Sequence, residues 1–176
     1  LIDDDYTVNA DRMVLYFDEN KPLNVGPDDI YAFGNVLISS FKRNENKKIV
    51  AKSTLAADKG SIFRKKNKAL FLGNVKVRDD AFQLDSDQLH IFVEKYPQGT
   101  VFPVMKKGEA PRRIRINREY ELKHITAFKN VKIFRKNAEG DEKAYGDRAD
   151  YFIKNRKITL TGTAEKPPVL YKGENT

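Results

Sequence analysis

The segment Gly73-Asn74-Val75-Lys76-Val77-Arg78 places small or apolar residues at its odd positions and polar residues at its even positions. Successive side chains of a β-strand point to opposite faces, so this alternation predicts a strand with one buried and one hydrated face. The same alternation recurs at residues 130–133 and 157–162. No stretch longer than one turn has the spacing of an amphipathic helix. The sequence therefore predicts an all-β protein.

The alternating segments also repeat one another. Residues 32–38, 71–77 and 127–133 share an apolar residue followed by Gly-Asn-Val or Lys-Asn-Val, and residues 160–164 form a more divergent copy. A small residue followed by Asp precedes each copy, at Asp11, Asp58, Asp87 and Asp150. Glycine inside a strand marks a bend, so we expect corners at Gly34, Gly73 and Gly162. The shortest interval between these aspartates is 29 residues, which favours a stack of small repeats sharing one core.

Length and composition exclude several classes of protein. The 176 residues suggest a single domain, 1–176, and the formal charge is +8. Without cysteine the chain has no disulfides and no thiolate metal site. No apolar run approaches the ~18–20 residues that cross a bilayer as a helix. The chain begins at Leu1 in the middle of a pattern, so we expect any signal peptide or membrane anchor to lie upstream.

Features of enzymes and metalloproteins are missing from the sequence. His90 and His124 are the only histidines, and His90 lies in a strand-like run. The paired aspartates lack the spacing of a calcium-binding loop, and there is neither a glycine-rich phosphate loop nor a Gly-x-Ser-x-Gly turn. We therefore predict no catalytic residues, no metal site and no cofactor.

The repeats resemble those of the LptA/OstA family of lipopolysaccharide-transport proteins. Residues 146–151 (Gly-Asp-Arg-Ala-Asp-Tyr) followed by 158–164 (Ile-Thr-Leu-Thr-Gly-Thr-Ala) are similar to the family's G-D-x-A-x-Y … L-x-G-x-A unit. Gly34-Asn35-Val36 and Gly73-Asn74-Val75 match its recurring G-N-V strand. The resemblance covers about residues 7–166. It does not include an insertion at about 95–123.

The resemblance implies an open β-jelly-roll of stacked antiparallel strands. In this family the apolar interior holds the acyl chains of lipid A. Modules stack strand edge to strand edge across the periplasm, between the inner and outer membranes. On this basis we expect a periplasmic location, lipopolysaccharide as ligand, and other Lpt-type jelly-roll proteins as partners. Head-to-tail self-association would use the edges near residues 6–17 and 158–164. Whether the chain is soluble like LptA or anchored like LptC stays open.

The alternation identifies the side chains that would line the interior. Counting by twos from each repeat's valine predicts an inner face on which lipid would bind, made of Ala32, Val36, Ile38, Phe71, Val75, Val77, Val131, Ile133, Ile158 and Leu160. The alternative is that these side chains pack against one another as an ordinary filled core. Residue types do not separate the two, and a structural β-repeat adaptor without ligand is therefore the second hypothesis.

The insertion at 95–123 holds eight basic and three acidic side chains, which accounts for +5 of the net +8. We predict that this insertion forms a long surface lobe between two strands. Arg112, Arg113 and Arg115 are candidates for contacts with lipid A phosphates. A nucleic-acid partner or a simply hydrated basic surface are the alternatives. Residues 106–118 contain no aromatic side chain on which bases would stack, so we expect no nucleic-acid partner.

Overall fold

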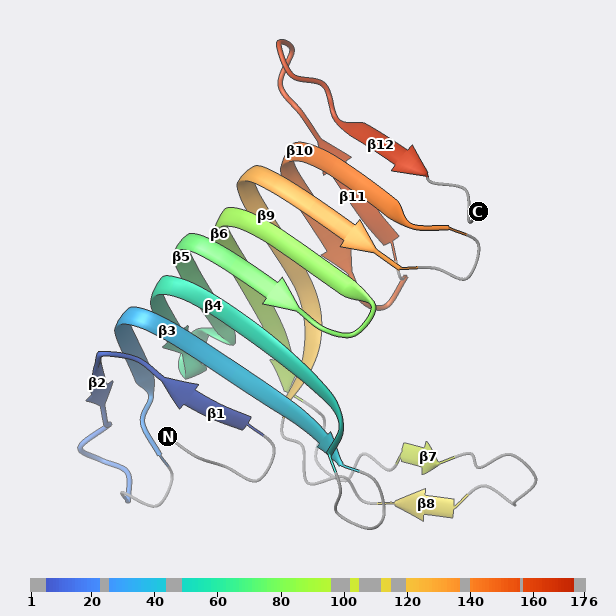
Figure 1. Cartoon of the computed structure of the whole chain (residues 1–176). Coiled ribbons are helices and arrows are strands. Elements are labelled where there is room, and N and C mark those ends of the chain that lie inside the picture. Colours follow the sequence, from blue (N-terminus) through green and yellow to red (C-terminus); the bar gives the residue numbers. More distant parts are fainter. Residues whose placement is uncertain are drawn as a thin grey trace.

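The computed structural model describes residues 6–22, 26–43, 49–95, 102–104, 112–114, 120–136, 140–155 and 157–172. Ten strands form one antiparallel sheet, in which each long strand pairs with the next one along the sheet (Figure 1). The described part of the chain contains no α-helix. The prediction of an all-β, open jelly-roll architecture is confirmed, and its two layers are the two halves of one sheet.

Six long strands lie between two short strands at each edge of the sheet. The short strands are β1 (Tyr6–Asn9), β2 (Arg12–Tyr16), β11 (Lys157–Thr161) and β12 (Val169–Lys172). The long strands are β3 (Asp29–Arg43), β4 (Ile49–Phe63), β5 (Lys68–Arg78), β6 (Phe82–Lys95), β9 (Tyr120–Arg135) and β10 (Glu142–Phe152). The 3-10 turn η2 (Arg64–Lys66) connects β4 to β5. Two further strands, β7 (Phe102–Val104) and β8 (Arg112–Ile114), form a separate ribbon.

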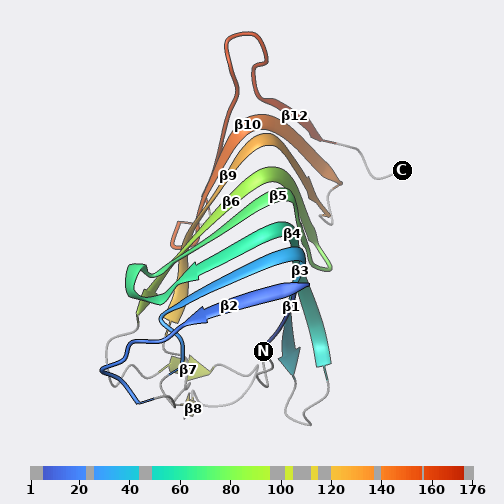
Figure 2. The same ribbon diagram turned by 90° about the vertical axis from the view of Figure 1, so that its left-hand side faces the viewer.

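A bend near the middle of the long strands folds the sheet into two arms, which meet along a line that we call the crease (Figure 2). In β3, β5 and β9 the bend coincides with a pair of residues at positive φ. These angles are 69° and 46° at Gly34 and Asn35, and 75° and 47° at Gly73 and Asn74. Glycine and asparagine tolerate this left-handed region best, which explains the recurring Gly-Asn step. The strand pairing shifts register at these steps, as expected for β-bulges.

A carboxylate from the neighbouring strand lies over each bend. The asparagine of the bend donates a hydrogen bond to it, with nitrogen-to-oxygen distances of 3.0 Å for Asn35 to Asp11, 3.0 Å for Asn74 to Asp58 and 2.9 Å for Asn130 to Asp87. A Cβ atom added at Gly34 or Gly73 would overlap that carboxylate. The Asp element and the Gly-Asn element are therefore two halves of one motif, joined across strands.

The fourth copy of the motif departs from the sequence prediction in two ways. Asp147, and not Asp150, lies opposite the Lys129-Asn130 bend, because Gly146 pairs with Val131 and Arg148 with Phe128. Gly162 is not a corner within a strand, because β11 ends at Thr161. Residues 162–168 instead leave the sheet at the crease and project beyond it (Figure 2).

Each edge of the sheet is one strand interrupted at the crease. β1 and β2 pair with the two halves of β3, through Val8 with Ile38 and Met13 with Ala32. At the other end, β11 and β12 pair with the two halves of β10. The predicted edge at residues 6–17 matches β1 and β2. The predicted edge at 158–164 is incomplete, because β12 forms the rest of that edge.

The insertion is shorter than predicted. β6 and β9 remain paired as far as Lys95 with Tyr120, and Lys123 forms an ion pair of 3.0 Å with Glu94. Within the insertion the described residues are β7 and β8, which pair with each other. Arg112 and Arg113 lie on β8, and Arg115 falls outside the described residues.

Candidate functional site

The inward positions of the two arms form a continuous apolar surface, which we call the concave face. In the arm that contains β1 and β12, strand register aligns one inward residue per strand from edge to edge. This row consists of Val8, Ile38, Leu55, Val77, Leu84, Ile133, Ala144 and Leu170. No charged side chain interrupts it.

The arm that contains β2 and β11 presents two such rows. The row nearer the crease consists of Met13, Ala32, Gly60, Phe71, Leu89, Ala127, Ala149 and Leu160. The row nearer the rim consists of Leu15, Ile30, Ile62, Ala69, Ile91, Ile125, Tyr151 and Ile158. Gly60 has no side chain because the Phe71 ring already occupies that space, 3.0 Å from where a Cβ would lie.

All ten residues predicted for the inner face lie on the concave face. Val36, Val75 and Val131, at the crease, are each 1% exposed. Ala32, Phe71 and Ile133 are also buried. Ile38, Val77 and Leu160 are half-buried against the same cluster, and Ile158 is 40% exposed. Whether these side chains bind lipid stays a prediction.

Exposure rises from the crease to the rims and toward the C-terminal edge. Leu89 is 1% exposed, whereas Leu15 is 40% exposed and Leu170 is 69% exposed. The two arms therefore share a filled core along the crease, while the inward residues farther out keep contact with solvent. The core near the crease is therefore filled, and lipid binding by the more exposed inward residues stays a prediction.

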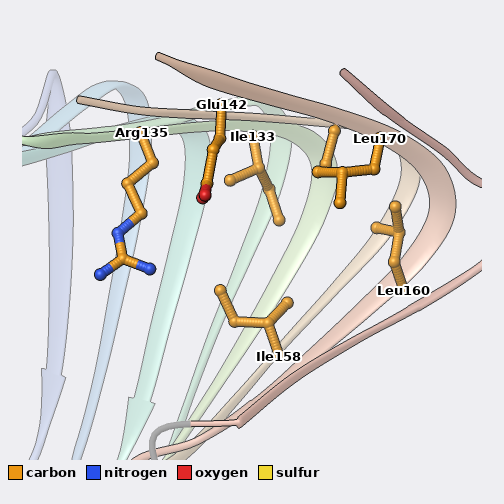
Figure 3. Close-up of a pocket in the computed structure, with 7 residues that line it drawn as sticks. Ile133, Arg135, Glu142, Ile158, Leu160 and Leu170 are labelled. Atoms are coloured by element: carbon orange, nitrogen blue, oxygen red, sulfur yellow. The ribbon is translucent and has the colours of Figure 1, made fainter. Parts of the chain in front are cut away.

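A pocket of about 280 Å³ lies on the concave face near the C-terminal edge. It is lined by Ile133, Arg135, Glu142, Ala144, Ile158, Leu160 and Leu170. Figure 3 shows Arg135 and Glu142 pointing into the same space as Ile158. Three of the lining residues were among the predicted inner-face residues.

The sequence analysis did not predict the other four lining residues, Arg135, Glu142, Ala144 and Leu170. The same count by twos that selects Val131 and Ile133 continues to Arg135, so the signal was present. The prediction of the inner face included only apolar residues, and Arg135 is charged. The predicted phosphate contacts Arg112 and Arg113 are on β8, and their side chains lie outside what the structure describes.

The outer face of the arm with β11 carries a polar and aromatic cluster. Asp150, 8% exposed, accepts hydrogen bonds from Arg148 at 2.7 Å and from Thr126 at 2.9 Å. The Arg148 guanidinium holds the pKa of Asp150 below its usual value. The His124 ring stacks on Phe152, with ring centres 4.2 Å apart. This cluster joins β9 to β10 and lies on the opposite face of the sheet from the pocket.

Comparison with known proteins identifies the family. The family model for the LptA/(LptD N-terminal domain) LPS transport protein matches residues 54–169, about two thirds of the chain. This chain belongs to the LptA/LptD N-terminal family of lipopolysaccharide transport proteins. Among proteins of curated function, none matches the sequence. The family transports lipopolysaccharide and is not enzymatic, in agreement with the sequence analysis.

A solved structure shows the same fold. LptH from Pseudomonas aeruginosa, described as the LptA homologous periplasmic component of the lipopolysaccharide transport device, superposes with a TM-score of 0.55. The match covers 96% of this chain and 94% of the LptH chain, at 7% sequence identity. At so low an identity the likeness shows a shared architecture of the LptA type.

The ranges that the structure describes contain neither a candidate metal site nor a helix that could span a membrane. No group of three or more His, Asp or Glu side chains there is arranged to hold a metal ion. No helix in the same residues is long and apolar enough to cross a membrane.

Proposed function

We propose that this chain carries lipopolysaccharide through the periplasm, with the acyl chains of lipid A held on the concave face. The observation that supports this most directly is the set of apolar rows that run from one edge of the sheet to the other. The rows are unbroken, and near the rims and at the C-terminal edge they stay open to solvent, where Leu15 and Leu170 are 40% and 69% exposed. A path along which an acyl chain moves from one module to the next needs that continuity.

The gradient of exposure fits a carrier. The buried residues along the crease pack against one another and join the two arms. The exposed inward residues near the rims are available to acyl chains. Each methylene removed from water contributes ~0.8 kcal/mol, so a few chains covered over several carbons would supply useful affinity.

The split edges fit assembly with like modules. Among the residues that the structure describes, β1 with β2 and β11 with β12 are the outermost strands of the sheet, and a further strand can be added to the outermost strand of a sheet. We infer that other Lpt proteins, or further copies of this chain, join there to bridge the inner and outer membranes. The family and the description of LptH as a periplasmic component support a periplasmic location for this chain.

Binding of purified lipopolysaccharide to an Ile158→Asp variant tests the proposal. Val75 is fully buried, so a carboxylate there would disrupt the fold, whereas Ile158 is exposed on the inner face of β11. The matched control is Thr161→Asp, which places the same carboxylate on the outer face of the same strand. Circular dichroism and thermal unfolding establish that both variants fold.

We expect saturable binding by the parent chain and by Thr161→Asp, and a loss of about tenfold or more for Ile158→Asp. The measurement is repeated in high salt, which screens exposed charges but leaves apolar contacts intact. Equal binding by both variants, or loss of binding in salt alone, would place the lipid on the charged surface. Absence of binding in the parent chain would favour the adaptor without ligand.

A further inference from the structure

One pair of opposite charges lies in a pocket that is otherwise aliphatic. Arg135 of β9 and Glu142 of β10 are directly paired in the strand register. They belong to the row next to the rim, which consists of Phe82, Arg135, Glu142 and Lys172. The rows deeper in both arms carry no charge, so the side chains of the concave face change from apolar to charged at this rim.

The position of Arg135 leaves its guanidinium available to a ligand. The side chain is exposed, and no ion pair joins it to a carboxylate among the residues that the structure describes. A guanidinium presents its donors in a planar fork that matches the oxygens of a phosphate. The Glu142 carboxylate beside it supplies only acceptors, so it favours a hydroxyl or amide N–H and repels a second anion.

The apolar part of the pocket constrains the rest of the ligand. Ile158 and Leu160 of β11 and Leu170 of β12 lie within the same pocket as the two charges (Figure 3). A molecule that fills the pocket therefore presents an anion and hydrogen-bond donors at one end and hydrocarbon at the other. A soluble sugar phosphate would leave the aliphatic side chains exposed, and a plain fatty acid would leave Glu142 without a donor.

We propose that Arg135 and Glu142 form a headgroup subsite for an acylated, phosphorylated sugar. The phosphate binds Arg135, a sugar hydroxyl or amide N–H donates to Glu142, and an acyl chain lies on Ile158, Leu160 and Leu170. The inference rests on the proposed function and adds an orientation to it. The headgroup lies at the rim beside the C-terminal edge, and the chains point toward the crease.

The test combines a change in the protein with a change in the ligand. Equilibrium binding of lipid A and of its enzymatically dephosphorylated form is measured for the parent chain and for Arg135→Gln. Glucosamine 1-phosphate, which has no acyl chains, is the third ligand. The control variant is Lys132→Gln, which removes one positive charge from the same strand on the outer face. Thermal unfolding verifies that both variants are folded.

We expect Arg135→Gln to weaken lipid A binding by about tenfold, as for a charge-assisted hydrogen bond, and to change binding of the dephosphorylated form less than twofold. Lys132→Gln should leave both affinities unchanged, and glucosamine 1-phosphate should bind far more weakly than lipid A. Equal losses for both lipids in Arg135→Gln, or no loss in either, would overturn the headgroup subsite while leaving the carrier function intact. If the parent chain binds neither lipid, the carrier function itself fails, and the subsite with it.

Discussion

In β3, β5 and β9 the bend at the crease contains two consecutive residues in the left-handed region, and the side chains at these positions set the cost of the bend. Gly73 avoids the steric penalty of a Cβ atom at φ 75°, and it leaves room for the Asp58 carboxylate. Lys129 occupies the equivalent position at φ 60° with a full side chain. The left-handed conformation costs a residue with a Cβ about 1–2 kcal/mol. The third bend is therefore strained where the first two are not.

Substitutions at these two positions should have opposite effects on stability. Gly73→Ala should lower the free energy of unfolding by about 2 kcal/mol or more, because it adds the left-handed penalty and displaces Asp58 from Asn74. Lys129→Gly should raise it by about 0.5–1 kcal/mol, the steric gain less the extra entropy of glycine in the unfolded chain. Urea unfolding measures both. Destabilisation by Lys129→Gly would show that its side chain contributes more than the bend costs.

His90 should make the free energy of unfolding depend on pH near and below pH 6.5. Its burial on the outer face, together with the nearby charge of Lys68, lowers the pKa of His90 below its ordinary value of 6.5. The unfolded chain therefore binds this proton at a higher pH than the folded chain. The contribution to stability is fully present above pH 6.5 and is lost as the pH falls below it.

We expect His90→Gln to flatten the decline in the free energy of unfolding between pH 7 and pH 5. Asp150 acts in a different range, because its pKa is lowered from an ordinary value of 3.8. Its contribution is present above about pH 4 and is lost in stronger acid. Urea titrations at a series of pH values separate the two. An unchanged slope between pH 7 and pH 5 in His90→Gln would assign the decline to other groups.

Among the elements, β6 and β9 show how the sheet tolerates a long insertion. The two strands pair up to Lys95 and Tyr120, with β-bulges along their length. The insertion therefore leaves the sheet and returns to it at two residues that are directly paired. The described strands of the insertion pair with each other and not with the sheet. The sheet therefore closes at this end without help from the segment between them.

Replacement of residues 96–119 by Asn-Gly should stabilise the protein. The two-residue turn suits an antiparallel hairpin, and shortening the loop from 24 residues lowers the entropy cost of closure by roughly 2 kcal/mol. Thermal and urea unfolding measure the gain. A loss of stability would show that the insertion packs on the sheet. The same variant also tests the predicted phosphate contacts of Arg112, Arg113 and Arg115. If these contacts form, the variant should bind lipopolysaccharide more weakly than the parent chain in low salt.

At the scale of the whole molecule, the register of the sheet predicts how a second copy would continue it. Next to the crease, strand register aligns one outward-facing residue per strand from edge to edge. This row consists of Arg12, Phe33, Lys59, Leu72, Gln88, Phe128, Arg148 and Thr161. If a second copy extends the sheet with its crease aligned, its Arg12 lies beside Thr161 of the first copy. The two edge strands would then run antiparallel, as all their neighbours do.

Disulfide trapping tests this register, because the natural chain contains no cysteine. A mixture of Arg12→Cys and Thr161→Cys proteins should form a cross-linked heterodimer under mild oxidation. Arg12→Cys mixed with Lys157→Cys is the out-of-register control, since Lys157 lies four residues from Thr161 on the same face. Equal cross-linking of both pairs would indicate random collision. Absence of any concentration-dependent association in sedimentation would refute self-assembly at these edges.

The sequence by itself determined the properties that depend on near neighbours along the chain. The period-two alternation identified the strands and the ten inner-face residues, because neighbouring side chains of a strand point to opposite faces. The Gly-Asn steps at Gly34 and Gly73 identified the bends, because the left-handed preference belongs to the residue itself. The G-N-V and G-D-x-A-x-Y motifs led to the correct family for the same local reason.

Only the tertiary structure decided which residues meet across strands. It joined each crease aspartate to an asparagine on the next strand, assigned the fourth position to Asp147, and completed the C-terminal edge with β12. It also placed Arg135 and Glu142 in a pocket with Ile158, although Arg135 and Ile158 belong to strands that are not adjacent. Such contacts depend on strand register and on the angle between the two arms. Both are set by the packing of the whole sheet around its crease and are not encoded in any single segment.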